Sequence, residues 1–150
     1  MSTTSGISVA DECIHAFNEL RYGKSAKPKF IIFKISDDNK RVIVDESSTE
    51  VGFEAFRQRL AAAVDKEGNP VPRYAIYDME YDLGSEGRRT KTVFVHWGPC
   101  EAPIKLCMLY ASSAMCFKST LNSIQASIHA DSLEELTWEV VLKEVSGGQA

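Results

Sequence analysis

Two pairs of apolar, β-branched segments, each pair joined by a polar turn, most constrain what this chain can fold into. The first pair covers 30–35 and 41–45, and the second covers 74–81 and 89–97. Strands joined by so short a connection form antiparallel hairpins. Segments whose apolar residues recur with helical spacing precede, separate and follow these hairpins. The expected helices are 9–22, 53–64, 104–122 and 133–145, and an alternating segment at 124–129 predicts one more strand.

Hairpins interleaved with helices indicate one class of fold. The apolar faces of the helices must be buried, and the faces of the sheet are the surfaces available to cover them. Phe30–Phe33 is apolar at every position, which indicates a strand covered on both sides. The sequence therefore predicts an α/β (α+β mixed) fold, in which a central five- to six-stranded mixed β-sheet is flanked by helices on both faces.

The length of 150 residues suits one hydrophobic core, since single domains commonly hold about 100–200 residues. We predict one domain over 1–150, with flexible ends at 1–6 and 146–150, where most residues are small and polar. No apolar stretch typical of a secretory signal peptide follows Met1. The formal net charge of −4 does not favour nucleic-acid binding, which requires a basic face.

The cysteine spacing argues against disulfides and against a metal centre. Cys13, Cys100, Cys107 and Cys116 include no C-x-x-C pair. Free cysteines are most often buried, and they persist in reducing compartments. We therefore predict buried free thiols, no metal site and a cytoplasmic protein.

Residues typical of catalysis are present, but no catalytic motif accompanies them. His15, His96 and His129 have no G-x-S-x-G or Cys-Gly signature nearby, and each is interpreted as structural or solvated. The sequence predicts no enzymatic activity and no cofactor. A small hydrolase that uses Ser or Cys with His is the rival class, and it would require a deep pocket with a perturbed histidine.

A basic group stands out in this acidic chain. Arg88, Arg89 and Lys91 enter the strand at 89–97, and the two-residue period of a strand places Arg89 and Lys91 on one face. Such a group could bind an acidic partner. It could equally protect an edge strand from aggregation.

The segment that follows Pro103 is expected to form a helix with an unusual outer face. Between 104 and 122 its only charged residues are Lys105 and Lys118, although a solvated helix face is normally charged. A protein-contact surface explains this face, and cover by another element is the alternative. Tyr110, Ala114, Phe117 and Leu121 are expected in the core, and Lys105, Leu109, Ser112, Cys116 and Ser119 are expected on the outer face.

The order of these features resembles the actin-depolymerising factor/cofilin family over nearly the whole chain. Ser5-Gly6 is followed by Val9-Ala10-Asp11-Glu12, as at the N-terminus of that family. The strand RYAIYDMEY at 73–81 and the basic segment GRRTK at 87–91 are similar to the family's hairpin. The segments APIK at 102–105 and MLYASS at 108–113 resemble its long actin-binding helix. No single segment is as specific as their combination.

The resemblance implies an actin-binding protein that binds monomers and filament sides, severs filaments, speeds depolymerisation and prefers ADP-bound actin. It implies a monomeric protein of the cytoplasmic actin cytoskeleton, inhibited by phosphatidylinositol bisphosphate and by phosphorylation of Ser5. By analogy, a surface used on monomers and filaments contains Ser5, Gly6, Lys105, Met108, Leu109, Ser112 and Ser119. A surface used only on filaments contains Arg88, Arg89, Lys91, Lys143 and Glu144.

Several positions depart from the family pattern. Cys107 and Ser119 stand where cations are usual, and Ala114-Met115 replaces a Lys-Asp pair. Lys143 and Glu144 stand where some members carry an acidic residue followed by a basic one, and the loop at 65–72 is longer than usual. A coactosin-like filament side-binder with little severing activity is therefore the closest alternative. A lipid-binding module that acts through Arg88, Arg89, Lys91 and Lys105 is a further one.

Overall fold

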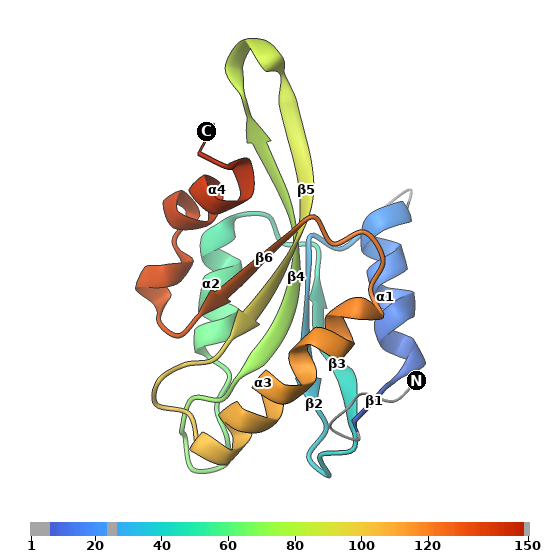
Figure 1. Ribbon diagram of the computed structural model, residues 1–150, viewed down its shortest axis with the longest axis vertical. Coiled ribbons are helices and arrows are strands. Elements are labelled where there is room, and N and C mark those ends of the chain that lie inside the picture. Colours follow the sequence, from blue (N-terminus) through green and yellow to red (C-terminus); the bar gives the residue numbers. More distant parts are fainter. Residues whose placement is uncertain (1–6, 24–26, 149–150) are drawn as a thin grey trace.

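A computed structural model describes residues 7–23 and 27–148, which form one six-stranded sheet with helices on both faces (Figure 1). The strand order is β1-β3-β2-β4-β5-β6, in which the two outer pairs are parallel and the three inner pairs are antiparallel. The strands are β1 (Ser8–Val9), β2 (Phe30–Ile35), β3 (Arg41–Ser48), β4 (Arg73–Asp82), β5 (Arg88–Trp97) and β6 (Ala126–Ala130). The helices are α1 (Asp11–Tyr22), α2 (Phe53–Ala61), α3 (Ile104–Ser119) and α4 (Trp138–Ser146), with short 3-10 turns η1 (Gly84–Glu86) and η2 (Leu133–Leu136). The predicted fold class is confirmed.

The alternation of side chains along the strands divides the core into two layers. Phe30 and Ile32 of β2 face α2 and α4, whereas Ile31 and Phe33 face α1 and α3. All four are buried, which confirms that β2 is covered on both faces. The described residues include no helix long and apolar enough to cross a membrane.

The predicted helix ends were less accurate than the predicted helices. The first helix was expected to start at residue 9, but Ser8 and Val9 pair with β3, and the N–H of Ser8 donates to the carbonyl of Lys40. This pairing places the start of α1 at Asp11, because hydrogen bonds to β3 satisfy the chain before it. Likewise α2 ends at Ala61, so Val64 is half exposed instead of facing the core.

The predicted C-terminal helix is two elements. One helix was expected over 133–145, but η2 comes first, and the Thr137 side chain accepts the N–H of Val140 at the start of α4. Val140 is 45% exposed, whereas its neighbour Val141 is buried. Ser146 was predicted in the flexible C-terminal end, but it is buried and is the last residue of α4. Gly147 follows the helix in a left-handed conformation with φ 66°. A glycine adopts this conformation without steric cost.

Only Cys13 is fully buried, so the prediction of four buried thiols was wrong. Cys100 is exposed, and Cys107 and Cys116 are half-buried. The Cys13 Sγ donates to the carbonyl of Val42 at 3.3 Å. Burial, reinforced by the charge of Glu12, raises the pKa of the Cys13 thiol to about 12.

We therefore expect iodoacetamide at pH 8 to modify Cys100 in the native protein and Cys13 only after unfolding. The thiolate is the reacting species, and Cys13 has almost none at that pH and no solvent access. Peptide mapping by mass spectrometry, with and without denaturant, measures both sites. Equal modification of both in the native protein would contradict the burial of Cys13.

Candidate functional site

The outer face of α3 is an exposed stripe of apolar and small residues. Ile104, Met108 and Met115 are 76%, 65% and 81% exposed. Lys105, Ser112 and Ser119 are also exposed along the same helix. No charged residue other than Lys105 lies among them, so this stripe is suited to contact with another protein. We call Ile104, Lys105, Met108, Ser112, Met115 and Ser119 the α3 surface.

The hydroxyl groups on the α3 surface bond to their own helix. Ser112 Oγ donates to the carbonyl of Leu109 at 3.1 Å, and Ser119 Oγ donates to that of Cys116 at 2.8 Å. Leu109 itself was predicted on the outer face, but it is half-buried and packs against the core beneath α3. Ile104 and Met115 were not predicted as site residues. Their spacing of four and seven positions from Met108 was the available signal.

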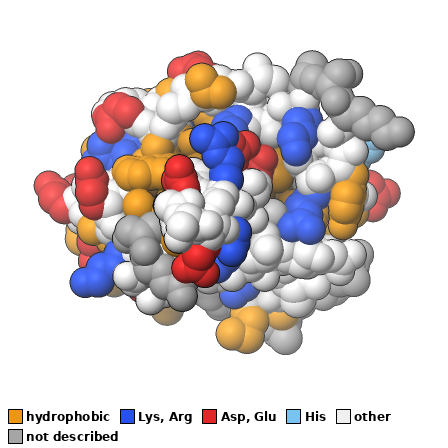
Figure 2. Space-filling model, turned by 90° about the horizontal axis from the view of Figure 1, so that it is seen from above, with side chains coloured by type: hydrophobic (Ala, Val, Ile, Leu, Met, Phe, Trp, Pro, Cys, Tyr) orange, Lys and Arg blue, Asp and Glu red, His pale blue; other side chains and the backbone are white. Residues whose placement is uncertain are grey.

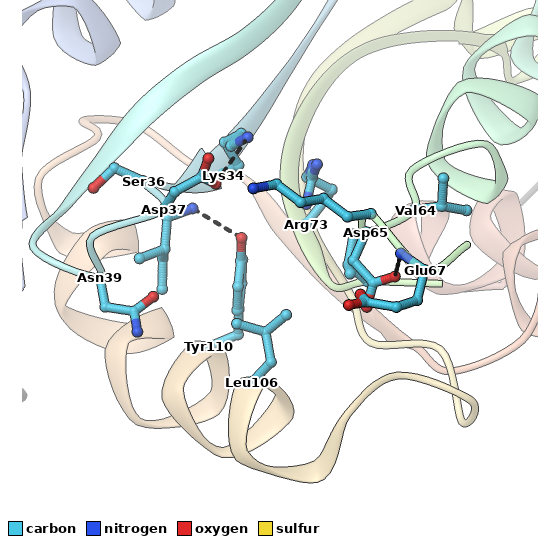
Figure 3. A pocket seen from close by; sticks show the side chains of 13 residues that line it. Lys34, Ser36, Asp37, Asn39, Val64, Asp65, Glu67, Arg73, Leu106 and Tyr110 are labelled. Carbon is cyan, nitrogen blue, oxygen red and sulfur yellow. Dashed lines mark hydrogen bonds and ion pairs between the residues drawn. The ribbon is translucent and has the colours of Figure 1, made fainter. Parts of the chain in front are cut away.

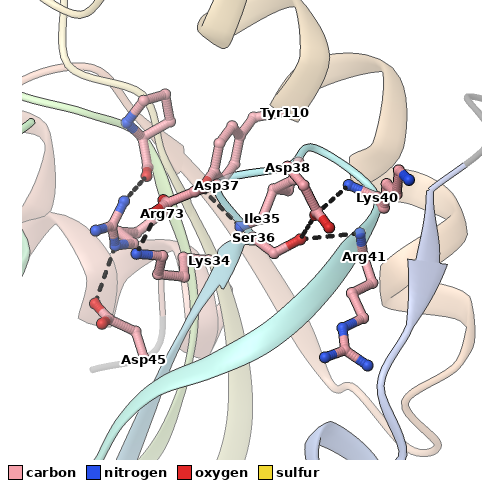
Figure 4. Close-up of polar contacts among 11 residues, drawn as sticks. Lys34, Ile35, Ser36, Asp37, Asp38, Lys40, Arg41, Asp45, Arg73 and Tyr110 are labelled. Carbon is pink, nitrogen blue, oxygen red and sulfur yellow. Dashed lines mark hydrogen bonds and ion pairs between the residues drawn. The ribbon is translucent and has the colours of Figure 1, made fainter.

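Three side chains hold α3 against the sheet. Tyr110 is buried, and its hydroxyl accepts the N–H of Ile35 at 2.8 Å (Figure 4). The hydroxyl of Tyr74 on β4 donates to the carbonyl of Tyr110. Burial raises the pKa of both phenols, so both stay protonated at neutral pH. Phe117, two turns further along the same face of α3, packs on Tyr74 with ring centroids 5.2 Å apart. These contacts fix which face of α3 points outward.

A hollow of about 560 Å³ lies below this network, between α3, the β2–β3 turn and the loop that precedes β4 (Figure 3). Arg73 lines it and donates to Asp45 at 3.1 Å and to the carbonyl of Pro72 at 2.9 Å. Of the described residues that line this hollow, none is His or Cys. The histidine with a shifted pKa is His96, because burial lowers that pKa to about 4. Its ring packs against the rings of Tyr74 and His129. The hydrolase alternative required a perturbed histidine in a deep pocket beside Ser or Cys, and His96 does not line this hollow.

The hairpin of β4 and β5 extends beyond the rest of the sheet, on the side where α4 ends (Figure 1). Arg88 lies 3.6 Å from Glu80, and Arg89 donates to the carbonyl of Glu86 at 2.8 Å. Viewed onto this end, Lys and Arg side chains are interspersed with Asp and Glu instead of forming one basic patch (Figure 2). Part of the basic charge predicted for this site is therefore already paired within the chain.

Lys91 has a different environment from the two arginines. It is half-buried, and its Nζ donates to the carbonyl of Val145 at 3.0 Å, near the C-terminus of α4. A cation is favourable there because the last carbonyls of a helix carry partial negative charge. Lys143 and Glu144 are exposed on α4 next to this contact. Lys91 thus ties α4 to the hairpin, and we call Arg88, Arg89, Lys143 and Glu144 the hairpin surface.

Comparison with known proteins identifies the family. The profile of the cofilin/tropomyosin-type actin-binding proteins matches residues 6–146. The chain belongs to this family. The cofilin of Gibberella zeae is 40% identical, over 97% of this chain and 97% of its own length. The cofilin of Saccharomyces cerevisiae is 39% identical, over 96% and 95%.

Solved structures agree with a cofilin fold. The crystal structure of Streptomyces griseoflavus cofilin is 34% identical and has a TM-score of 0.83, covering 95% of this chain and 99% of its own. Coactosin from Entamoeba histolytica has a TM-score of 0.77 at 19% identity, which shows the shared fold alone. The predicted resemblance to cofilins is confirmed. Ser5 and Gly6, which that resemblance places on the actin-binding surface, lie outside the described residues.

Proposed function

We propose that this cofilin-family chain binds actin monomers and filament sides, and promotes filament severing and depolymerisation. The observation that carries the proposal is the α3 surface: a helix face that is exposed, apolar and almost uncharged along its length. Such a face is suited to a protein partner, and the family is one of actin-binding proteins. Ser5, Gly6 and Leu109 belong to this proposal by family analogy, with Leu109 supporting the surface from below.

The hairpin surface is proposed as a second contact, used only on filaments. It projects from the sheet at the end where α4 terminates, away from the N-terminal end of α3 (Figure 1). A bound filament presents more than one subunit, so two separated surfaces on one small protein can contact two neighbours. The pairing of Arg88 with Glu80 favours the second candidate, a coactosin-like side-binder with little severing, because fewer cations remain for actin.

Finer properties are proposed on family analogy alone. They are a preference for ADP-bound actin, inhibition by phosphatidylinositol bisphosphate, inhibition by phosphorylation of Ser5, a monomeric state, a place in the cytoplasmic actin cytoskeleton and no enzymatic activity.

Sedimentation with filamentous actin tests the proposal. We expect the protein to pellet with filaments and to increase the amount of actin left in solution. Imaging of single labelled filaments should show breaks. Pelleting without additional soluble actin and without breaks would favour the coactosin-like candidate, and no pelleting would contradict actin binding.

Substitution of Ser5 by Glu is expected to lower the affinity for monomeric actin more than Lys105→Ala does. A phosphate at Ser5 would add about −2 charges, which must be desolvated at a tight interface. Lys105 is exposed, and a charge at a solvated rim contributes about 0–1 kcal/mol. Titration of labelled monomeric actin compares wild type, Ser5→Glu, Ser5→Ala and Lys105→Ala. Wild-type binding by Ser5→Glu would show that the proposed switch does not operate.

Arg89 and Lys91 were predicted to act together on filaments, and the contact of Lys91 with α4 now separates them. Arg89→Ala is expected to weaken filament binding and leave monomer binding and stability unchanged. Lys91→Met should also weaken filament binding, but it should lower the unfolding free energy by about 1 kcal/mol because the bond to Val145 is lost. Chemical denaturation and sedimentation measure both effects. Equal stability of the two variants would show that Lys91 does not fix α4.

A further inference from the structure

Two histidines that are 33 positions apart in the chain lie side by side on the sheet. His96 of β5 and His129 of β6 are partners in the parallel register of these strands. Their rings are stacked, with centroids 4.5 Å apart and an interplanar angle of 14°. Neither belongs to the α3 surface or to the hairpin surface. Their juxtaposition depends on strand pairing, so the sequence spacing that argued against a metal centre could not reveal it.

Both rings border one small space beside Gly98. A methyl group on Gly98 would lie 3.8 Å from Nε2 of His96 and 3.8 Å from Nε2 of His129. In the stacked arrangement the lone pairs of the two rings lie in nearly parallel planes, so one ion binds both only after the exposed His129 ring turns, and the absence of a side chain on Gly98 leaves room for that turn. The ring of His96 is held edge-to-face against Tyr74 at 5.5 Å, whereas His129 is exposed and can turn towards a ligand.

The surroundings favour a cation. A hollow of about 330 Å³ runs beside His129 and is lined by Glu134, Glu135 and Glu144. Their charges make the local potential negative, which raises the concentration of cations near the site.

We propose that His96 and His129 form a two-histidine site for a divalent transition-metal ion, held by the two Nε2 atoms beside Gly98. Imidazole suits Zn²⁺, Cu²⁺ and Ni²⁺, with metal–nitrogen distances of about 2.0–2.1 Å for zinc. No cluster of three metal-ligating side chains occurs among the described residues, so water completes the coordination. The ion joins β6 to β5 at the outer edge of the sheet. This site does not depend on the proposed function.

Isothermal titration of the untagged full chain with NiCl₂ at pH 7.5, in a buffer without chelators, tests the site. We expect one bound ion per chain. His129→Gln and His96→Gln should each weaken binding at least tenfold, because a chelate of two imidazoles becomes a single ligand. His15→Gln is the matched control, since His15 is exposed on α1, and it should bind as wild type. Cys100→Ser, which removes the exposed thiol, should also bind as wild type.

Imidazole NMR signals locate the ion independently. Substoichiometric Ni²⁺ should broaden the signals of His96 and His129 together and leave those of His15 sharp. Gly98→Val keeps both imidazoles but fills the space between them, and it should reduce affinity at least tenfold. Gly98 has no positive φ, so its backbone accepts a side chain. Wild-type affinity in His129→Gln or in Gly98→Val, or broadening of His15 first, would overturn the proposal. His129 is exposed, so the His129→Gln result does not depend on a disturbed core.

Discussion

Replacing Met108 with Glu is expected to lower the affinity for actin monomers and for filaments by at least about 100-fold. Met108 is 65% exposed and lies between Ile104 and Met115 on the α3 surface. A carboxylate there would lose its hydration against a partner without gaining an opposite charge. Removing an unpaired charge from water costs several kcal/mol, and about 1.4 kcal/mol corresponds to a factor of ten in affinity. The folded state should be unaffected, because the side chain already faces solvent.

A matched control separates the position from the chemistry of this substitution. Val51 is 78% exposed in the loop before α2, where it borders a hollow with Phe53 and Trp138 of the layer opposite α3. Val51→Glu introduces the same charge at an exposed apolar position and should bind actin as wild type does. Titration of labelled monomers, sedimentation with filaments and thermal melting are compared for both variants. Equal losses of binding, or wild-type binding by Met108→Glu, would place the actin contact elsewhere.

The sequence was sufficient for the core and for most of the α3 surface, but it missed Ile104 and Met115. Tyr110, Phe117 and Leu121 were predicted in the core and are buried, because large apolar residues at helical spacing can be covered in only one way. The outer face was centred on Ser112 and Cys116, and Met108 was added through the family resemblance. At about 100° per residue, the direction opposite Tyr110 and Phe117 lies within about 30° of Met108, Met115, Ser112 and Ser119 alike. The methionines and the serines therefore share one exposed stripe, and Met115 was missed although the same geometry places it there.

Contacts between distant segments explain the remaining differences. Ser8 is a good helix cap by local propensity, but pairing with β3 satisfies its backbone instead. The bond from Lys91 to Val145 joins residues 54 positions apart, and its existence depends on where α4 packs. The same holds for His96 and His129. A single sequence reports periodicity within an element, whereas these contacts are set by the way in which elements assemble.

Phe117→Ala is expected to lower the unfolding free energy by about 3–5 kcal/mol, the usual cost of removing a fully buried ring. Phe117 is 0% exposed and packs on Phe33 and Tyr74, with ring centroids 5.0 and 5.2 Å away. The alanine leaves a cavity at the point where α3 meets β2 and β4. Phe117→Leu is the matched control, because it retains most of the apolar volume and should cost much less. Urea unfolding followed by circular dichroism measures both.

The two faces of α3 should then be separable by experiment. Phe117 points into the core, away from the α3 surface, so it is expected to act on actin binding only through the fraction of molecules that are folded. At low temperature, where Phe117→Ala remains folded, its affinity for monomers should be within about threefold of wild type, since a change below about 0.65 kcal/mol is expected when no contact is lost. Met108→Glu should show the reverse, with wild-type stability and lost binding. If Phe117→Ala loses affinity while folded, the packing beneath α3 must set the shape of the contact surface, and the helix does not act as a rigid support.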